Sequence, residues 1–181
     1  MAAARWLDRT RRASLGGVAT GYDLAQVNIM RLRAALDSPE LAAFVAALDP
    51  VNALAEQSPG FVWRLQAGDG NSTSIRIFDD ATLIVNMSTW RSLEALTDYA
   101  YRTAHAEIMR RRREFALPIA EAYLALWWVP RGHQPTIAEA EDRLRHLRAH
   151  GPTPFAFGVR TPFPAPDASS TRKTSDDARA D

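Results

Sequence analysis

The sequence predicts an α+β fold, a ferredoxin-like antiparallel sheet with its helices on one face. Residues 24–32 alternate between apolar and polar side chains, as a half-buried strand does. Residues 39–56 and 88–115 carry apolar side chains at spacings of three or four, as amphipathic helices do. The expected order is strand, helix, two or three strands, helix, strand, helix and strand. Its first part is the split βαβ pattern.

The first helix and the strand after it are marked by their boundary residues. Pro39 suits the first turn of a helix, and Pro50 is expected to interrupt that helix. A Ser-Pro-Gly run then ends the helix. The next strand covers 61–66, and its alternation places Trp63 on one face and Arg64 on the other.

The second half of the chain begins with two short segments, 74–78 and 82–87, which are both expected to be extended. A serine or threonine then caps the helix 88–115, which ends before Pro118. The apolar run 122–129 is typical of a buried central strand.

A third helix and a last strand complete the predicted domain. Thr136 and Glu139 have the spacing of a capping box, so a helix is expected to begin there and to end at Gly151. Residues 155–159 are predicted as a final strand. With both long helices on one face, the other face of the sheet would be bare. A second copy of the chain would cover it, which predicts a homodimer.

Composition excludes several classes of protein. The chain has 181 residues, 22 basic and 21 acidic side chains, and no cysteine. It therefore has no disulfide scaffold, thiolate metal site or cysteine nucleophile. Its only lysine, Lys173, lies in a polar tail. The near-neutral charge argues against a nucleic-acid partner. No segment is long and apolar enough for a membrane span or a signal peptide, so a cytoplasmic protein is expected.

The ends of the chain differ in composition from the middle. Residues 1–21 form a basic segment that we expect to be flexible, and 164–181 are rich in Pro, Ala, Ser, Thr and Asp, which predicts disorder. A single domain is expected at 22–163. Phosphate-loop, zinc-protease, serine-hydrolase and clustered acidic metal motifs are absent from the sequence, so no metal site is predicted.

One edge of the second long helix carries the strongest candidates for chemistry. On a helical wheel Tyr101, His105 and Arg112 fall together beside the apolar stripe. His105 is there either a general base or a haem or metal ligand, or else a core histidine bonded to the sheet. The other arginines of the run 110–113 are expected to be solvated or to pair with neighbouring glutamates.

Further candidates lie on the strands and in the loop after the apolar run. His133 follows a buried strand, where sites often gather, but it is equally suited to capping the next helix. Buried amides need partners, and an aromatic wall suits a flat organic ligand. The polar and aromatic side chains that would line such a cavity are Gln26, Asn28, Trp63, Arg64, Asn86, Trp90 and Trp128.

Several sequence blocks, in order, resemble the bacterial family "domain of unknown function 3291". They are Asn86-Met87-Ser88-Thr89-Trp90-Arg91-Ser92-Leu93-Glu94-Ala95-Leu96, Tyr101-Arg102-Thr103-Ala104-His105, Met109-Arg110-Arg111-Arg112-Arg113-Glu114, Leu126 to Pro135 and His150 to Phe157. The resemblance covers about 22–164. An aromatic that often follows the Arg-Arg-x-Glu segment is displaced here to Phe115. The resemblance implies a dimeric α+β barrel, the fold class of antibiotic-biosynthesis and haem-degrading monooxygenases, but it supplies no activity.

Three functions remain open from the sequence. The first is a cofactor-independent enzyme, monooxygenase-like, acting on a small aromatic or polyketide-like compound. In it His105 removes a proton, Asn28 and Asn86 hold the oxyanion, and Trp63 and Trp90 sandwich the ring. The second is haem binding through His105 or His133. The third is a non-catalytic ligand-binding or structural homodimer.

Overall fold

The central strand, β1, organises the whole sheet, in which each pairing is antiparallel. In this computed structural model, which describes residues 21–68 and 70–166, β1 pairs with β3 on one side and with β5 and β4 on the other. β2 pairs with the far side of β3. The elements are β1 (Tyr22–Leu32), a 3-10 turn (Pro39–Leu41), α2 (Ala42–Gln57), β2 (Phe61–Arg64), β3 (Leu83–Trp90), α3 (Leu93–Arg102), α4 (His105–Phe115), β4 (Ala116–Leu117), β5 (Leu124–Pro130) and α5 (Ile137–His150). The α+β class and the antiparallel sheet are thus confirmed.

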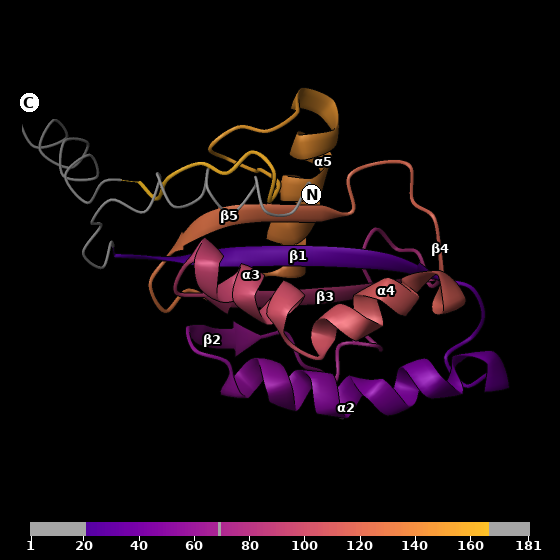
Figure 1. The fold of residues 1–181 in the computed structure, drawn as a ribbon. Coiled ribbons are helices and arrows are strands. Elements are labelled where there is room, and N and C mark those ends of the chain that lie inside the picture. Colours follow the sequence, from indigo (N-terminus) through magenta and orange to yellow (C-terminus); the bar gives the residue numbers. More distant parts are fainter. Residues whose placement is uncertain (1–20, 69, 167–181) are drawn as a thin grey trace, which may run out of the picture.

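The alternation of β1 divides the sheet into two faces. Ala25, Val27 and Ile29 are buried on what we call the α5 face, together with Ala140 and Leu144 of α5. The even-numbered residues 24–32 of β1 point to the opposite face, which we call the cavity face. There they meet α2, α3 and α4. Figure 1 shows α3 and α4 in front of the sheet and α5 behind it.

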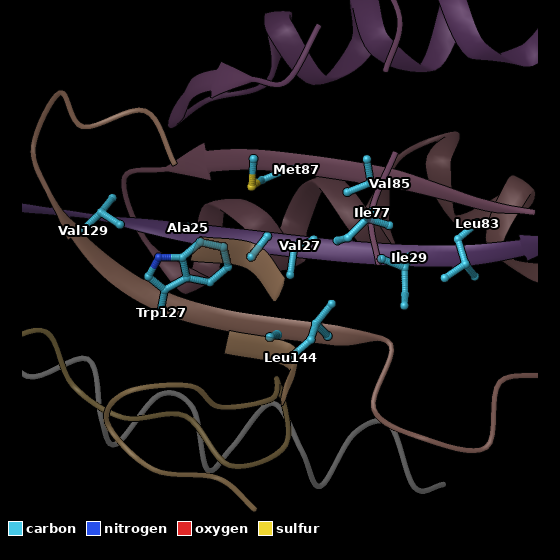
Figure 2. Close-up of a cluster of buried hydrophobic side chains, with 12 residues drawn as sticks. Ala25, Val27, Ile29, Ile77, Leu83, Val85, Met87, Trp127, Val129 and Leu144 are labelled. Atoms are coloured by element: carbon cyan, nitrogen blue, oxygen red, sulfur yellow. The ribbon is translucent and has the colours of Figure 1, made fainter. Parts of the chain in front are cut away.

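The two long segments predicted as helices do share the cavity face, but α5 lies on the opposite face, so the expectation of helices on one face only is wrong. The α5 face is covered within one chain by α5 and by the segment before β3, where Ile77 is fully buried. Figure 2 shows Val27, Ile29 and Val85 of this face packed with Trp127 and Leu144. Among the described residues the face that a second copy was expected to cover is therefore not bare. The homodimer stays a prediction, without this argument in its favour.

The structure differs from the sequence expectations at four places. α2 continues through Pro50, which costs one backbone hydrogen bond but no break. Residues 74–78 form turns rather than a strand, and Phe78 has the left-handed value φ 55°. The predicted last strand is reduced to two isolated bridges, Phe157 with Leu126 and Ala156 with Thr153. The predicted helix 88–115 begins only after β3 and is divided into α3 and α4.

Several expected boundaries are confirmed. Thr136 and Glu139 make both bonds of the capping box that begins α5. Pro39 occupies the first turn of the 3-10 helix. In the described ranges no helix has the length and apolarity to cross a membrane. The predicted leader, 1–21, and tail, 164–181, lie almost entirely outside the described residues.

Candidate functional site

A cavity of about 190 Å³ lies between the cavity face and the helices α2, α3 and α4. Its size exceeds the roughly 150 Å³ of an engineered protein cavity that binds benzene, so it suits a compound of one or two rings. Most of the predicted site residues line it. They are Gln26, Asn28, Arg64, Asn86, Trp90, Tyr101, His105 and Arg112. Strands and helices far apart in the sequence are thus brought to one place.

Trp63 is not part of the cavity wall, because β2 contains a bulge. Phe61 pairs with Trp90, but the register shifts by one residue before Trp63, which pairs with Thr89. A bulge of this kind reverses the face to which the following side chains point. Trp63 consequently packs on the α5 face, while Arg64 faces the cavity. Trp63 and Trp90 do not sandwich a common ligand.

Trp128 and His133 also lie outside the cavity. Trp128 is on β5, and its indole Nε1 donates to the carbonyl oxygen of Phe163 at 2.9 Å. His133 is exposed in the loop before α5, where its Nε2 lies 2.9 Å from a carboxylate oxygen of Glu139. That carboxylate also accepts from the backbone N–H of Thr136. His133 therefore supports the helix cap, which was the structural alternative for this residue.

A directed hydrogen-bond network forms the polar floor of the cavity. The indole Nε1 of Trp90 donates to Ser88 Oγ at 2.9 Å. Gln26 Nε2 donates to Ser88 Oγ at 3.1 Å and to Asn86 Oδ1 at 2.8 Å. Because Asn86 uses its oxygen as the acceptor, its Nδ2 hydrogens remain for a ligand. Asn28 lies opposite Asn86 on the neighbouring strand and presents a second amide.

The surroundings of His105 define which of its ring nitrogens is basic. Nδ1 lies 3.2 Å from the carbonyl oxygen of Ala100, and a carbonyl only accepts, so Nδ1 carries the hydrogen. The described residues offer no hydrogen-bond partner to Nε2. Burial lowers the pKa of His105 below its ordinary value, although the bond to Ala100 acts in the opposite direction. A neutral imidazole with a free Nε2 lone pair therefore borders the cavity.

The division between α3 and α4 places this histidine. Thr103 adopts an extended backbone conformation, and its Oγ1 donates to Tyr99 O at 2.6 Å. The same oxygen accepts from the backbone N–H of His105 at 3.2 Å. Thr103 thus closes the last turn of α3 and supports the first turn of α4. His105 is the first residue of α4, where the positive end of the helix dipole also disfavours an imidazolium.

Tyr99 is a cavity residue that the sequence analysis did not identify. Its ring stacks on Trp90 at 5.0 Å between centroids and meets His105 at 4.8 Å. Burial raises the pKa of the Tyr99 phenol well above its ordinary value, against the nearby positive charge of Arg64. The protonated hydroxyl donates to Val51 O at 3.3 Å. The sequence did not predict that Tyr99 and His105 meet, because residues six apart point in different directions on one continuous helix. They meet here only because the chain breaks between α3 and α4.

The arginine run on α4 separates into different roles. Arg110 pairs with Glu107, and Arg111 pairs with Glu114, as expected for surface charges. Arg112 instead lines the cavity, and its Cζ lies 4.2 Å from the ring centroid of Tyr123. Arg64, the other cavity arginine, is bound to Glu56 at 2.8 Å and to the carbonyl oxygen of Gly70 at 2.7 Å.

Haem, the cofactor considered from the sequence, stays a prediction for His105. A bond from Nδ1 to a carbonyl is the support that an axial histidine commonly has. Among the described residues, no group of three or more histidine, aspartate or glutamate side chains is arranged to hold a metal ion.

The comparison with known proteins identifies a family. The model of the family described as "Domain of unknown function (DUF3291)" matches residues 23–174. Neither a curated protein nor a solved structure matches the chain significantly.

Proposed function

This chain belongs to the DUF3291 family, and we propose that it binds a small planar compound in its cavity and removes a proton from it with His105. The single observation that carries the proposal is the fixed tautomer of His105. Its Nδ1 is occupied by the carbonyl of Ala100 and its Nε2 is left as a base beside the cavity. A general base needs this combination of a free lone pair and a held ring.

The floor of the cavity supplies hydrogen-bond donors for the oxyanion that proton removal creates. When a C–H bond next to a carbonyl breaks, its proton forms an N–H bond at Nε2. Its electron pair becomes the new C=C bond, and the π electron pair of the carbonyl moves to the oxygen. The Nδ2 hydrogens of Asn86 and the amide of Asn28 are the donors that would stabilise this oxyanion. Tyr99 and Phe61 provide aromatic surface for the rest of the compound.

Proton exchange on a model compound tests the proposal. We choose 2-tetralone, a fused two-ring ketone with acidic C–H bonds, and follow its deuterium uptake in D₂O by NMR. The wild type should accelerate exchange, and His105→Gln should lose about a hundredfold or more of that acceleration. His133→Gln is the matched control and should keep it, because His133 lies outside the cavity. Equal acceleration by the His105 variant would remove His105 from the role of base.

The alternative function is a ligand-binding protein without catalysis. The same cavity and the same polar floor support it, since neither requires a reaction. Native mass spectrometry of the purified protein distinguishes it. A retained compound, together with 2-tetralone that binds without any exchange above the buffer rate, would favour this alternative over proton removal.

A further inference from the structure

We infer that the compound bound in the cavity is an anion, held at its acidic end by Arg112 and reaching toward His105 with its other end. This inference rests on the proposed function and adds the chemical class of the ligand. Its first support is the charge of the wall. The described residues that line the cavity include Arg64 and Arg112 but no aspartate or glutamate. A wall with this imbalance of charge favours a negative ligand.

Arg112 is the arginine that remains available. Arg64 already binds Glu56 through Nε and the carbonyl of Gly70 through Nη1, and the Glu56 carboxylate balances its charge. Arg112 has no carboxylate within ion-pair distance in the described chain, and its guanidinium lies over the Tyr123 ring. A guanidinium presents N–H groups in a fork that matches a carboxylate, and two parallel bonds to one anion then fix its orientation.

The spacing of His105 and Arg112 on α4 predicts the length of the ligand. His105 and Arg112 are seven residues apart, which is about two turns and about 10 Å along the helix axis. Ile108 and Met109 lie between them and also line the cavity. One helix face therefore offers a base, an apolar middle and a cation in sequence. A two-ring compound with a carboxylate at one end has the matching pattern.

Two probes of equal shape test the inference, 2-naphthoate and its neutral amide, 2-naphthamide. Their affinities for the full chain are measured by isothermal titration calorimetry. The carboxylate should bind the wild type about tenfold to a hundredfold more tightly than the amide. Arg112→Gln should remove this preference. Arg113→Gln should keep it, because it deletes the same charge from an exposed position of the same helix.

The outcomes separate the inference from the function on which it rests. A preference that is lost in Arg112→Gln and kept in Arg113→Gln supports the inference. Equal binding of both probes to the wild type overturns the anionic ligand but leaves the binding cavity in place. A preference that persists in Arg112→Gln overturns the role of Arg112. Failure of both probes to bind the wild type overturns this inference and the proposed function together.

Discussion

The ring of His105 is fixed by the backbone of the helix that precedes it, because its Nδ1 lies 3.2 Å from the carbonyl oxygen of Ala100. Ala100 belongs to α3, and His105 is the first residue of α4. The carbonyl is one of those left without an intrahelical partner at the end of a helix. One bond therefore satisfies the end of α3 and sets the tautomer of the candidate base on α4.

The first prediction concerns the pH dependence of stability. Burial holds the pKa of His105 below its ordinary value of 6.5, so below that pH the unfolded chain binds this proton more readily than the folded protein does. The contribution of the neutral ring to stability is thus fully present above pH 6.5 and declines as the pH falls toward the folded pKa. Urea unfolding of wild type and His105→Gln at about pH 7.5 and about pH 5 measures it.

The free energy of unfolding of the wild type should fall more between these two pH values than that of His105→Gln. An imidazole titration by NMR gives the independent check, since the His105 resonance should shift with a midpoint below 6.5. A midpoint above that value would contradict the burial that the structure gives this ring.

The second prediction concerns Ser88 in the cavity floor. Its Oγ accepts from Gln26 and from the indole of Trp90, and all three side chains are buried. Ser88→Ala leaves both donors without that acceptor, which should lower the free energy of unfolding by about 1–3 kcal/mol. Ser74→Ala, at an exposed position, is the control and should change it by less than about 0.5 kcal/mol. Chemical denaturation that finds the two variants equally stable would contradict the network.

The cavity itself shows how far residue patterns reach. The wheel of one long helix placed Tyr101, His105 and Arg112 together, and they do line one cavity although α3 and α4 are separate helices. The break falls between the first of these residues and the other two, and both helices stay on the cavity face of the sheet. The amide side chains on β1 and β3 were predictable because alternation alone assigns their face, whereas Ser88 was expected to cap a helix and lies instead on β3.

Other features depend on facts that a sequence pattern does not contain. The bulge in β2 inserts one residue between Phe61 and Trp63, and strict alternation has no sign of it. The stripe of α5 shows that this helix is half-buried but not which face of the sheet it covers. Both errors concern the choice between two faces, and that choice is made by tertiary packing.

The third prediction concerns Thr103, which joins α3 to α4. Thr103→Ala removes the bond to Tyr99 O and the acceptor for the His105 N–H, so it should cost about 1 kcal/mol of unfolding free energy. Thr103→Ser keeps the hydroxyl and should restore most of it. Thr97→Ala, whose hydroxyl bonds only the Glu94 carbonyl of its own turn, should cost less than about 0.5 kcal/mol. A Thr103→Ser variant as unstable as Thr103→Ala would show that the hydroxyl is not what matters.

The fourth prediction separates backbone strain from crowding at two glycines. Gly60 and Gly132 have nearly the same left-handed φ, 82° and 85°. A Cβ at Gly60 would lie 2.6 Å from Ala95 Cβ of α3, whereas a Cβ at Gly132 would meet nothing within 4 Å. Gly132→Ala should therefore cost only the strain of the left-handed conformation, about 1–2 kcal/mol.

Gly60→Ala should cost that amount and about 1–3 kcal/mol more, because α3 or the start of β2 must shift to make room. This shift would also move Phe61, which lines the cavity beside Trp90. Urea unfolding of both variants measures the difference, and the affinity for 2-naphthamide should fall in Gly60→Ala alone. If the two variants lost equal stability, the close approach of α3 to the turn before β2 would be wrong. Glycine would then be needed at position 60 only for its left-handed backbone conformation.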